Sequence, residues 1–303
     1  MTDRNRTPHG DKAGVPKRIF SPARHEAQVA KEAAPSPQTL DPSYRLAFQD
    51  DDFLLREDLR PVRFQLELLK TQLILEEANI ASTFVFYGSA RIPSPERAPM
   101  LVEAAKTPEQ RKIAGNLAAN SRYYEEARKL ARMASRVGPD EEGKRQFVVC
   151  SGGGPSIMEA ANRGAADVGA ESIGLNIVLP HEQAPNPYVT PHLSLRFHYF
   201  ALRKMHFLLH ARAVAAFPGG FGTFDEFFEL LTLVQTGKIA PLPILLFGRA
   251  FWNTVVNWRA LADNGVIAPQ DLELFRFVET AEEAWAIVRD YYGMDEEGRE
   301  AAE

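Results

Sequence analysis

Short apolar runs that alternate with helical stretches constrain the fold of this chain more than any other feature. The runs lie at residues 83–87, 147–150, 172–177, 213–217 and 242–247. Helical patterns are predicted from Pro61 and over 108–136, 157–168, 200–210, 223–236, 251–264 and 281–292. Strands alternating with helices form parallel sheets, and right-handed crossovers place helices on both faces. We therefore predict an α/β fold with a doubly wound, Rossmann-like parallel sheet.

The N-terminal part of the chain differs from the rest in composition. Residues 1–45 are rich in Pro, Ala, Arg and Lys, which predicts a disordered tail or an arm that orders against a partner subunit. Residues 46–80 are predicted to form a helical extension, 81–295 a Rossmann-like catalytic domain, and 296–303 a C-terminal tail. Within the extension, Val62, Leu66, Leu69 and Leu73 recur at helical spacing. This stripe could be core, or could be buried against another protomer.

Charge and cysteine content limit the kinds of partner and compartment. The formal net charge is -5, which argues against a broad nucleic-acid or anionic-membrane surface. Cys150 is the single cysteine, so an internal disulfide is excluded and a reducing compartment fits. Cys150 closes an apolar strand and is expected to be buried rather than reactive. Without a signal peptide or an apolar span, we expect a soluble, cytoplasmic protein.

A glycine-rich loop, Pro218-Gly219-Gly220-Phe221-Gly222-Thr223, joins a predicted strand to a predicted helix. Glycines let the backbone approach a ligand, and the free N–H groups and dipole of a helix start favour a phosphate. Thr223 is expected to cap this helix. The plainer interpretation is a tight turn in which Asp225 and Glu226 complement the helix dipole. Three glycines in four positions exceed the needs of a turn, which favours a ligand, and catalysis would explain a carboxylate beside phosphate.

Other phosphate, metal and cofactor motifs are missing. The chain has no G-x-x-x-x-G-K-[ST] loop, and Gly220-Phe221-Gly222 lacks the third glycine of the dinucleotide fingerprint. His206 and His210 have the i, i+4 spacing of metal ligands but no third ligand. We therefore predict neither a metal nor a cofactor.

Two more loops follow predicted strands at the same edge of the sheet. Ser151 to Ser156, which includes Gly153, leads into a helix, and Gly88-Ser89 follows the strand that ends at Tyr87. Each loop alone is weak evidence for a ligand site, because such glycines can simply allow close packing of a helix on a strand. Ligands of open parallel sheets lie beyond the carboxyl ends of the strands, so these loops are expected to line one pocket. Arg203 and Lys204 point about 100° apart on a helix, so one of them can face the ligand.

Several of these stretches resemble the Lonely Guy (LOG) family, which comprises cytokinin-activating phosphoribohydrolases and related bacterial nucleotide glycosidases. Residues 218–226 match its P-G-G-x-G-T-x-x-E signature, and Arg203-Lys204 matches its R-K pair. Similarity extends over about residues 83–292 and includes the Pro180-His181-Glu182 segment. The chain departs from the compact form in residues 1–80, in an insertion at 93–122 and in Ser156, where glycine is frequent. Phe200 stands where plant-like members usually carry methionine, and in this the chain resembles larger bacterial members.

The resemblance implies an N-glycosidase that acts on a nucleoside 5′-monophosphate, either AMP or a cytokinin riboside 5′-monophosphate, and yields free base and ribose 5-phosphate. It implies that Arg203 and Glu226 are catalytic. The substrate-binding residues would be Gly88, Ser89, Gly153, Glu182, Lys204, Gly219, Gly220, Phe221, Gly222, Thr223 and Thr232. A homodimer or larger homo-oligomer is expected, without nucleic-acid or membrane partners. The alternative is a non-catalytic carrier of a phosphorylated cofactor such as molybdenum cofactor.

Overall fold

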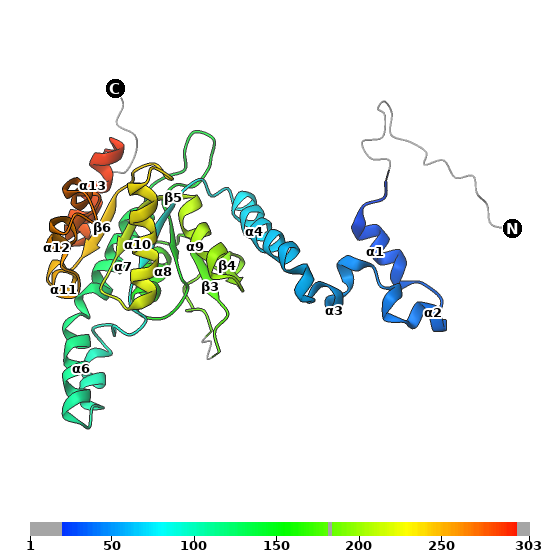
Figure 1. The fold of residues 1–303 in the computed structure, drawn as a ribbon, viewed down its shortest axis with the longest axis horizontal. Coiled ribbons are helices and arrows are strands. Elements are labelled where there is room, and N and C mark those ends of the chain that lie inside the picture. The colour runs from blue at the N-terminus through cyan, green and yellow to red at the C-terminus, as the bar shows by residue number, and fades with distance from the viewer. Residues whose placement is uncertain (1–19, 181–183, 296–303) are drawn as a thin grey trace. The chain divides into compact units, whose positions relative to one another are not determined.

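The computed structural model describes residues 20–180 and 184–295 (Figure 1). The chain divides into two compact units, Met1–Gln65 and Leu66–Glu303, and each is described by itself. In the first unit, short helices occur within the stretch for which the sequence predicts a disordered tail or a partner-dependent arm. They are α1 (Ala23–Lys31) and α2 (Pro37–Leu40), and α3 (Asp51–Leu54) and the start of α4 (Arg60–Glu77) follow within residues 46–80. Helices α1 to α3 bury no residue, so tertiary packing contributes little to them.

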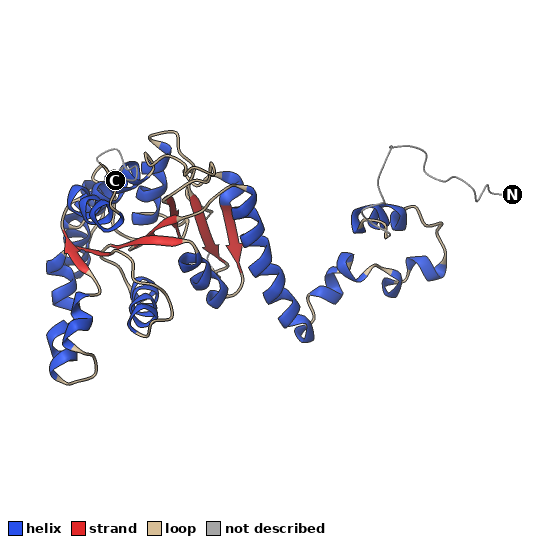
Figure 2. Cartoon of the chain, turned by 90° about the horizontal axis from the view of Figure 1, so that it is seen from above, coloured by secondary structure: helices blue, strands red, loops and turns tan. Residues whose placement is uncertain are grey.

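A parallel sheet forms the centre of the second unit, and its strands are drawn red in Figure 2. The strands are β1 (Thr83–Tyr87), β2 (Val148–Ser151), β3 (Ile173–Ile177), β4 (Ser194–Phe197), β5 (Ala211–Ala216), β6 (Ile244–Phe247) and β7 (Arg276–Val278). Their order is β4-β3-β2-β1-β5-β6-β7, and every neighbouring pair is parallel. The predicted doubly wound α/β fold is confirmed.

Helices cover both faces of this sheet. They are α5 (Ala98–Glu103), α6 (Pro108–Ala119), α7 (Arg122–Ala134), α8 (Ile157–Ala166), α9 (Phe200–Leu209), α10 (Phe221–Gln235), α11 (Arg249–Val255), α12 (Trp258–Asp263) and α13 (Ala281–Tyr292). Helices α7, α8 and α13 share a core with one set of alternate strand residues. Phe217 of that set stacks on Phe247 at 4.2 Å between ring centroids. Helices α9 and α10 pack against β3 and β1 respectively.

Two predicted helices are each interrupted in the structure, so both predictions were wrong in extent. The helix predicted over 108–136 is α6 followed by α7, with a break at Asn120-Ser121. The helix predicted over 251–264 is α11 followed by α12. In both breaks an asparagine side chain bonds the backbone: Asn120 donates to Asn116 O (3.0 Å), and Asn257 accepts from Ala260 N (3.1 Å). Such local bonds compete with a continuous helix.

Helix α4 contacts the remainder of the second unit through one polar anchor and a few buried residues. Glu67 Oε1 accepts hydrogen bonds from the backbone N–H groups of His198 and Tyr199, both at 3.0 Å, just before α9 begins. Leu66, Leu69 and Leu73 are each about half exposed. These leucines are therefore not core of this chain.

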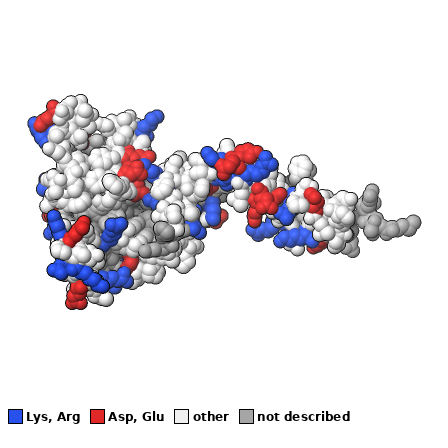
Figure 3. Space-filling view, turned by 60° about the horizontal axis from the view of Figure 1, so that its bottom comes forward, with Lys and Arg blue, Asp and Glu red and all other residues white. Residues whose placement is uncertain are grey.

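The surface of the described residues carries both signs of charge. Figure 3 shows basic and acidic side chains interspersed on the face that it draws. Among the described residues, no helix combines the length and the apolar content that crossing a bilayer requires.

Candidate functional site

A cavity of about 1300 Å³ lies beyond the carboxyl ends of the central strands. Strands β2 to β4 are added in order on one side of β1, and β5 to β7 on the other side. The strand order therefore reverses between β1 and β5, and ligands of this fold class bind at such a topological switch point. Its described lining includes Gly88, Ser89, Gly152, Gly153, Gly154, Arg203, Gly219, Gly220, Phe221, Gly222, Thr223 and Glu226. The structure thus brings the three predicted loops together in one cavity.

The glycine loop presents unused backbone donors to the cavity. Helix α10 begins at Phe221, and its first helical hydrogen bond runs from Phe224 N to Gly220 O (3.0 Å). The N–H groups of Phe221, Gly222 and Thr223 precede that bond and are the free donors of a helix start. A Cβ on Gly220 or Gly222 would meet nothing within 4 Å, and neither residue has a positive φ. The fold does not itself require these two glycines, so the open space that they leave suits a ligand.

Thr223 has a different role from the predicted one. The prediction that Thr223 caps α10 was wrong, because Gly220 is the N-cap residue and Thr223 lies inside the first turn. The side chain of Thr223 is buried and packs over Gly219, where any Cβ would collide with it. This contact explains why glycine is needed at 219, and it fixes the loop against the helix.

The second glycine turn is held by a strained residue. Ser156 has φ +68° and ψ -123°, a conformation that side-chain-bearing residues rarely adopt. The frequent glycine of the LOG family at this position therefore has a backbone reason. Ser156 Oγ donates a hydrogen bond to Ile92 O, which ties this turn to the loop after β1. Gly153 also has positive φ (+70°), and a Cβ there would collide with the amide of Asn176.

Arg203 and Glu226 form a buried ion pair between α9 and α10 at the cavity. Arg203 Nη2 donates to Glu226 Oε1, and the two side chains are 13 % and 10 % exposed. Burial raises the pKa of the Glu226 carboxyl above its usual value, and the positive charge and hydrogen bond of Arg203 oppose that rise. A carboxylate that is desolvated but paired responds strongly to a change of charge beside it.

Tyr87 and Cys150 lie in the same buried region. Burial and then the negative charge of Glu226 raise the pKa of the Tyr87 hydroxyl well above its usual value, so the hydroxyl stays protonated. Burial likewise raises the pKa of the Cys150 thiol. The prediction that Cys150 is buried is confirmed. His206 is also buried, and its pKa is lowered to about 4 by burial and by His210.

Three predicted site residues are not among the described lining. Lys204 Nζ pairs with Asp225 Oδ1 and Glu229 Oε2, both at 2.9 Å, and so joins α9 to α10 beside the Arg203 pair. Thr232 lies further along α10 and donates its hydroxyl to Phe228 O (2.8 Å). Glu182 lies outside the described residues.

The structure adds lining residues that the sequence analysis missed. Arg91 follows the Gly88-Ser89 turn, and Asn176 lies near the end of β3. Leu117 and Asn120 come from the 93–122 insertion, which therefore forms part of the wall. Side chains on β3, α6 and α11 share no motif spacing. The one readable signal was an arginine two residues after the predicted Gly88-Ser89 turn.

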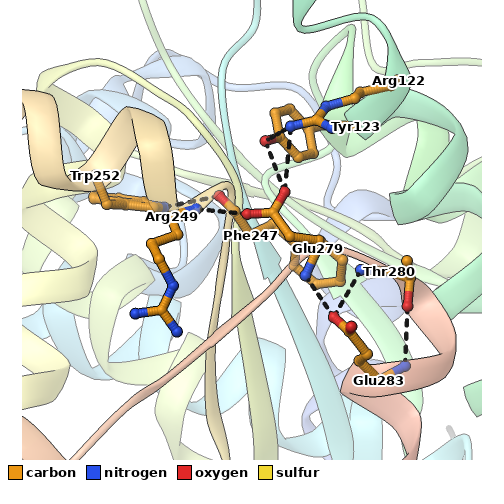
Figure 4. Close-up of polar contacts among 8 residues, drawn as sticks. All are labelled: Arg122, Tyr123, Phe247, Arg249, Trp252, Glu279, Thr280 and Glu283. Atoms are coloured by element: carbon orange, nitrogen blue, oxygen red, sulfur yellow. Dashed lines mark hydrogen bonds and ion pairs between the residues drawn. The ribbon is translucent and has the colours of Figure 1, made fainter.

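A polar cluster fixes α11, which contributes Phe251 and Val255 to the wall (Figure 4). Glu279 accepts hydrogen bonds from Arg249 N (3.0 Å) at one carboxylate oxygen and from Tyr123 Oη (3.3 Å) at the other. On the same helix, Trp252 donates from its Nε1 to Phe247 O at the end of β6 (2.9 Å). These bonds hold the start of α11 against the ends of β6 and β7.

Comparison with known proteins gives matches to a family model and to a curated protein. A family model described as "possible lysine decarboxylase" matches residues 158–288. The curated protein cytokinin riboside 5′-monophosphate phosphoribohydrolase LOG3 of Arabidopsis thaliana is 27 % identical over 148 residues, which are 48 % of this chain and 67 % of that protein.

Two solved structures are also similar. The X-ray structure of TM1055, a structural-genomics target, is 20 % identical and covers 69 % of this chain and 99 % of its own, with a TM-score of 0.41. The Moco carrier protein of Chlamydomonas reinhardtii is 14 % identical and covers 69 % and 96 %, with a TM-score of 0.37. The family model and the curated relative thus make the chain similar, over part of its length, to a Lonely Guy phosphoribohydrolase.

Proposed function

We propose that this chain hydrolyses the N-glycosidic bond of a nucleoside 5′-monophosphate to free base and ribose 5-phosphate. The observation that carries the proposal is the buried Glu226 carboxylate on the helix whose start offers free N–H groups to the cavity. With a rise of about 1.5 Å per residue, Glu226 lies roughly 6 Å further along α10 than Gly222. A phosphate at the helix start therefore leaves the attached ribose beside Glu226.

The chemistry that Glu226 supports follows from its charge. Glycosidic cleavage passes through an oxocarbenium-like transition state, with positive charge at C1′. A carboxylate in a desolvated site stabilises that charge more strongly than one in water. Water adds its oxygen to C1′, the electron pair of the C1′–N bond passes to the base nitrogen, and that nitrogen takes the proton that water loses. Glu226 would orient this water or the ribose hydroxyls.

Arg203 supports the proposal through its position. It neutralises Glu226 in the resting site, and its Nε is buried without a hydrogen-bond partner among the described residues. A ligand oxygen would satisfy this donor, as buried polar groups generally require. Arg203 would then hold the substrate while Glu226 faces C1′.

AMP and a cytokinin riboside 5′-monophosphate are the substrates that we propose, on the likeness to LOG3. The test is to incubate the protein with AMP and with isopentenyl-AMP and to separate the products by chromatography. Release of adenine or isopentenyladenine together with ribose 5-phosphate is expected. Survival of both nucleotides, and of GMP, CMP and UMP, would sink the enzyme proposal.

A non-catalytic carrier of a phosphorylated cofactor is the second candidate. A cavity of about 1300 Å³ is larger than most small-molecule sites and could admit a ligand larger than one nucleotide. Tight binding of such a cofactor without turnover of any nucleotide would favour the carrier. The buried acid beside the phosphate position favours the enzyme, because a carrier gains little from it.

Lysine decarboxylation is not what the cavity suggests. Pyridoxal-phosphate enzymes hold their cofactor through a lysine. The described lining contains no lysine, and Lys204 is engaged by Asp225 and Glu229.

A further inference from the structure

Among the described residues that line the cavity, one positive charge has no negative partner. Its described lining contains three charged side chains, Arg91, Arg203 and Glu226. Arg203 and Glu226 are bonded to each other and offset one another. The guanidinium of Arg91 is exposed and makes no ion pair or hydrogen bond with any described residue. The charge of an anionic ligand would therefore be met by Arg91 in addition to the start of α10.

Arg91 lies on a loop that is bonded to the phosphate-binding turn. Ser89 N donates to Pro218 O at 3.1 Å, which joins the loop after β1 to the first residue of the Pro218–Thr223 loop. Arg91 N donates to Ser89 Oγ at 3.0 Å. Arg91 is thus two residues from a direct contact with the glycine loop, and a hydroxyl fixes the backbone between them.

The other side of the same loop is bonded to the second glycine turn. Ile157 N donates to Ser89 O at 3.3 Å, and Ser156 Oγ donates to Ile92 O. Ser156 makes its bond from a left-handed backbone conformation that costs free energy. The residues on either side of Arg91 are therefore held before any ligand arrives, and such preorganisation lowers the entropic cost of binding.

We propose that Arg91 binds the 5′-phosphate of the substrate, together with the N–H groups at the start of α10. This assignment rests on the proposed function, since it takes the ligand to be a phosphomonoester. A guanidinium fork matches two phosphate oxygens, which an ammonium does not. Arg91 also supplies a positive charge that the mutually neutralised Arg203–Glu226 pair does not.

Direct binding of small probes tests the assignment without requiring turnover. Calorimetry is run with ribose 5-phosphate, with inorganic phosphate and with neutral ribose, on wild type, Arg91→Gln, Arg91→Lys and Arg97→Gln. Arg97 is the matched control, because it is an exposed arginine six residues along the same segment and does not line the cavity. Since Arg91 is exposed, its replacement leaves the core intact.

The expected result is a Kd for ribose 5-phosphate that rises about tenfold to a hundredfold in Arg91→Gln, as for loss of a charged hydrogen bond. The Kd of Arg91→Lys falls between those of wild type and Arg91→Gln, and the Kd of Arg97→Gln stays within about twofold of wild type. If AMP is hydrolysed, Arg91→Gln raises KM and leaves kcat nearly unchanged, because phosphate binding is equal in ground and transition states.

Equal ribose 5-phosphate binding by Arg91→Gln and wild type would overturn the assignment. So would a wild type that binds neither ribose 5-phosphate nor inorganic phosphate, or an equal loss in Arg97→Gln. The proposed function fails separately. It is lost if no nucleotide is cleaved, while a selective loss of phosphate binding in Arg91→Gln would still establish the site.

Discussion

Two opposing effects act on the pKa of Glu226, and their balance sets the expected pH dependence of kcat/KM. Burial raises the pKa of the carboxyl, and Arg203 holds it down. In the proposed reaction the ionised carboxylate stabilises positive charge at C1′, so we expect activity to fall as pH drops through that pKa. The acid limb of kcat/KM, which reports groups of the free enzyme, is therefore expected above the ordinary glutamate value of 4.5.

Removing the arginine charge moves this limb in a defined direction. In Arg203→Met the attraction that lowers the pKa of Glu226 is gone, and the limb shifts to still higher pH. The measurement is a pH profile of kcat/KM for AMP in both proteins. A limb below pH 4.5 in wild type, or one that Arg203→Met leaves in place, would contradict the assigned role of the pair.

Ser156 shows what one residue can and cannot reveal in a sequence. Its position in a glycine-rich turn is readable, and so is its departure from the glycine frequent in the LOG family. Its positive φ and its bond to Ile92 O depend on how α8 meets the loop after β1. Residue spacing carries no record of that contact.

At the scale of elements, the sequence predicts best where local signals agree. Helix α13 has the predicted bounds, Ala281–Tyr292, because Thr280 and Glu283 form a capping box and Gly293 ends the helix in the left-handed conformation. Strand β1 also has its predicted bounds. Strands β4 and β7 were not predicted, since they are short edge strands with some exposed side chains rather than fully apolar runs.

Some parts of the candidate site were predictable from the sequence, and other parts were not. The glycine loop, Arg203 and Glu226 lie within 24 residues of one another along α9, β5 and α10, and the fold brings them to one cavity. Lys204 follows Arg203 directly, yet it faces Asp225 and Glu229 instead of the cavity. The apolar wall draws on α6 and α11, which are more than 100 residues apart, so only the tertiary fold assembles it.

At the scale of the whole molecule, the half-exposed leucines of α4 support a proposed association with a second copy of this chain. Leu66, Leu69 and Leu73 form an apolar row that the second unit leaves uncovered. Leu69→Glu is expected to convert the protein from a dimer to a monomer, because it places a charge in the row. Met100→Glu, at a similarly exposed apolar residue on α5, is the control.

Light scattering coupled to size-exclusion chromatography gives the masses. We expect the mass of two chains for wild type and Met100→Glu, and of one chain for Leu69→Glu. A wild type with the mass of one chain would remove the proposed association, and a dimeric Leu69→Glu would move it to another surface.

We propose that the Glu226 carboxylate, next to a phosphate held by α10, drives glycosidic cleavage. The most direct measurement compares kcat/KM for AMP in wild type, Glu226→Gln and Asp225→Asn, with ribose 5-phosphate binding as the check on folding. Asp225 is the matched control, because its adjacent carboxylate pairs with Lys204 outside the cavity lining. We expect Glu226→Gln to lose activity by about a hundredfold or more while ribose 5-phosphate still binds, and Asp225→Asn to stay within about threefold of wild type. Activity within about threefold of wild type in Glu226→Gln, or an equal loss in Asp225→Asn, would contradict it.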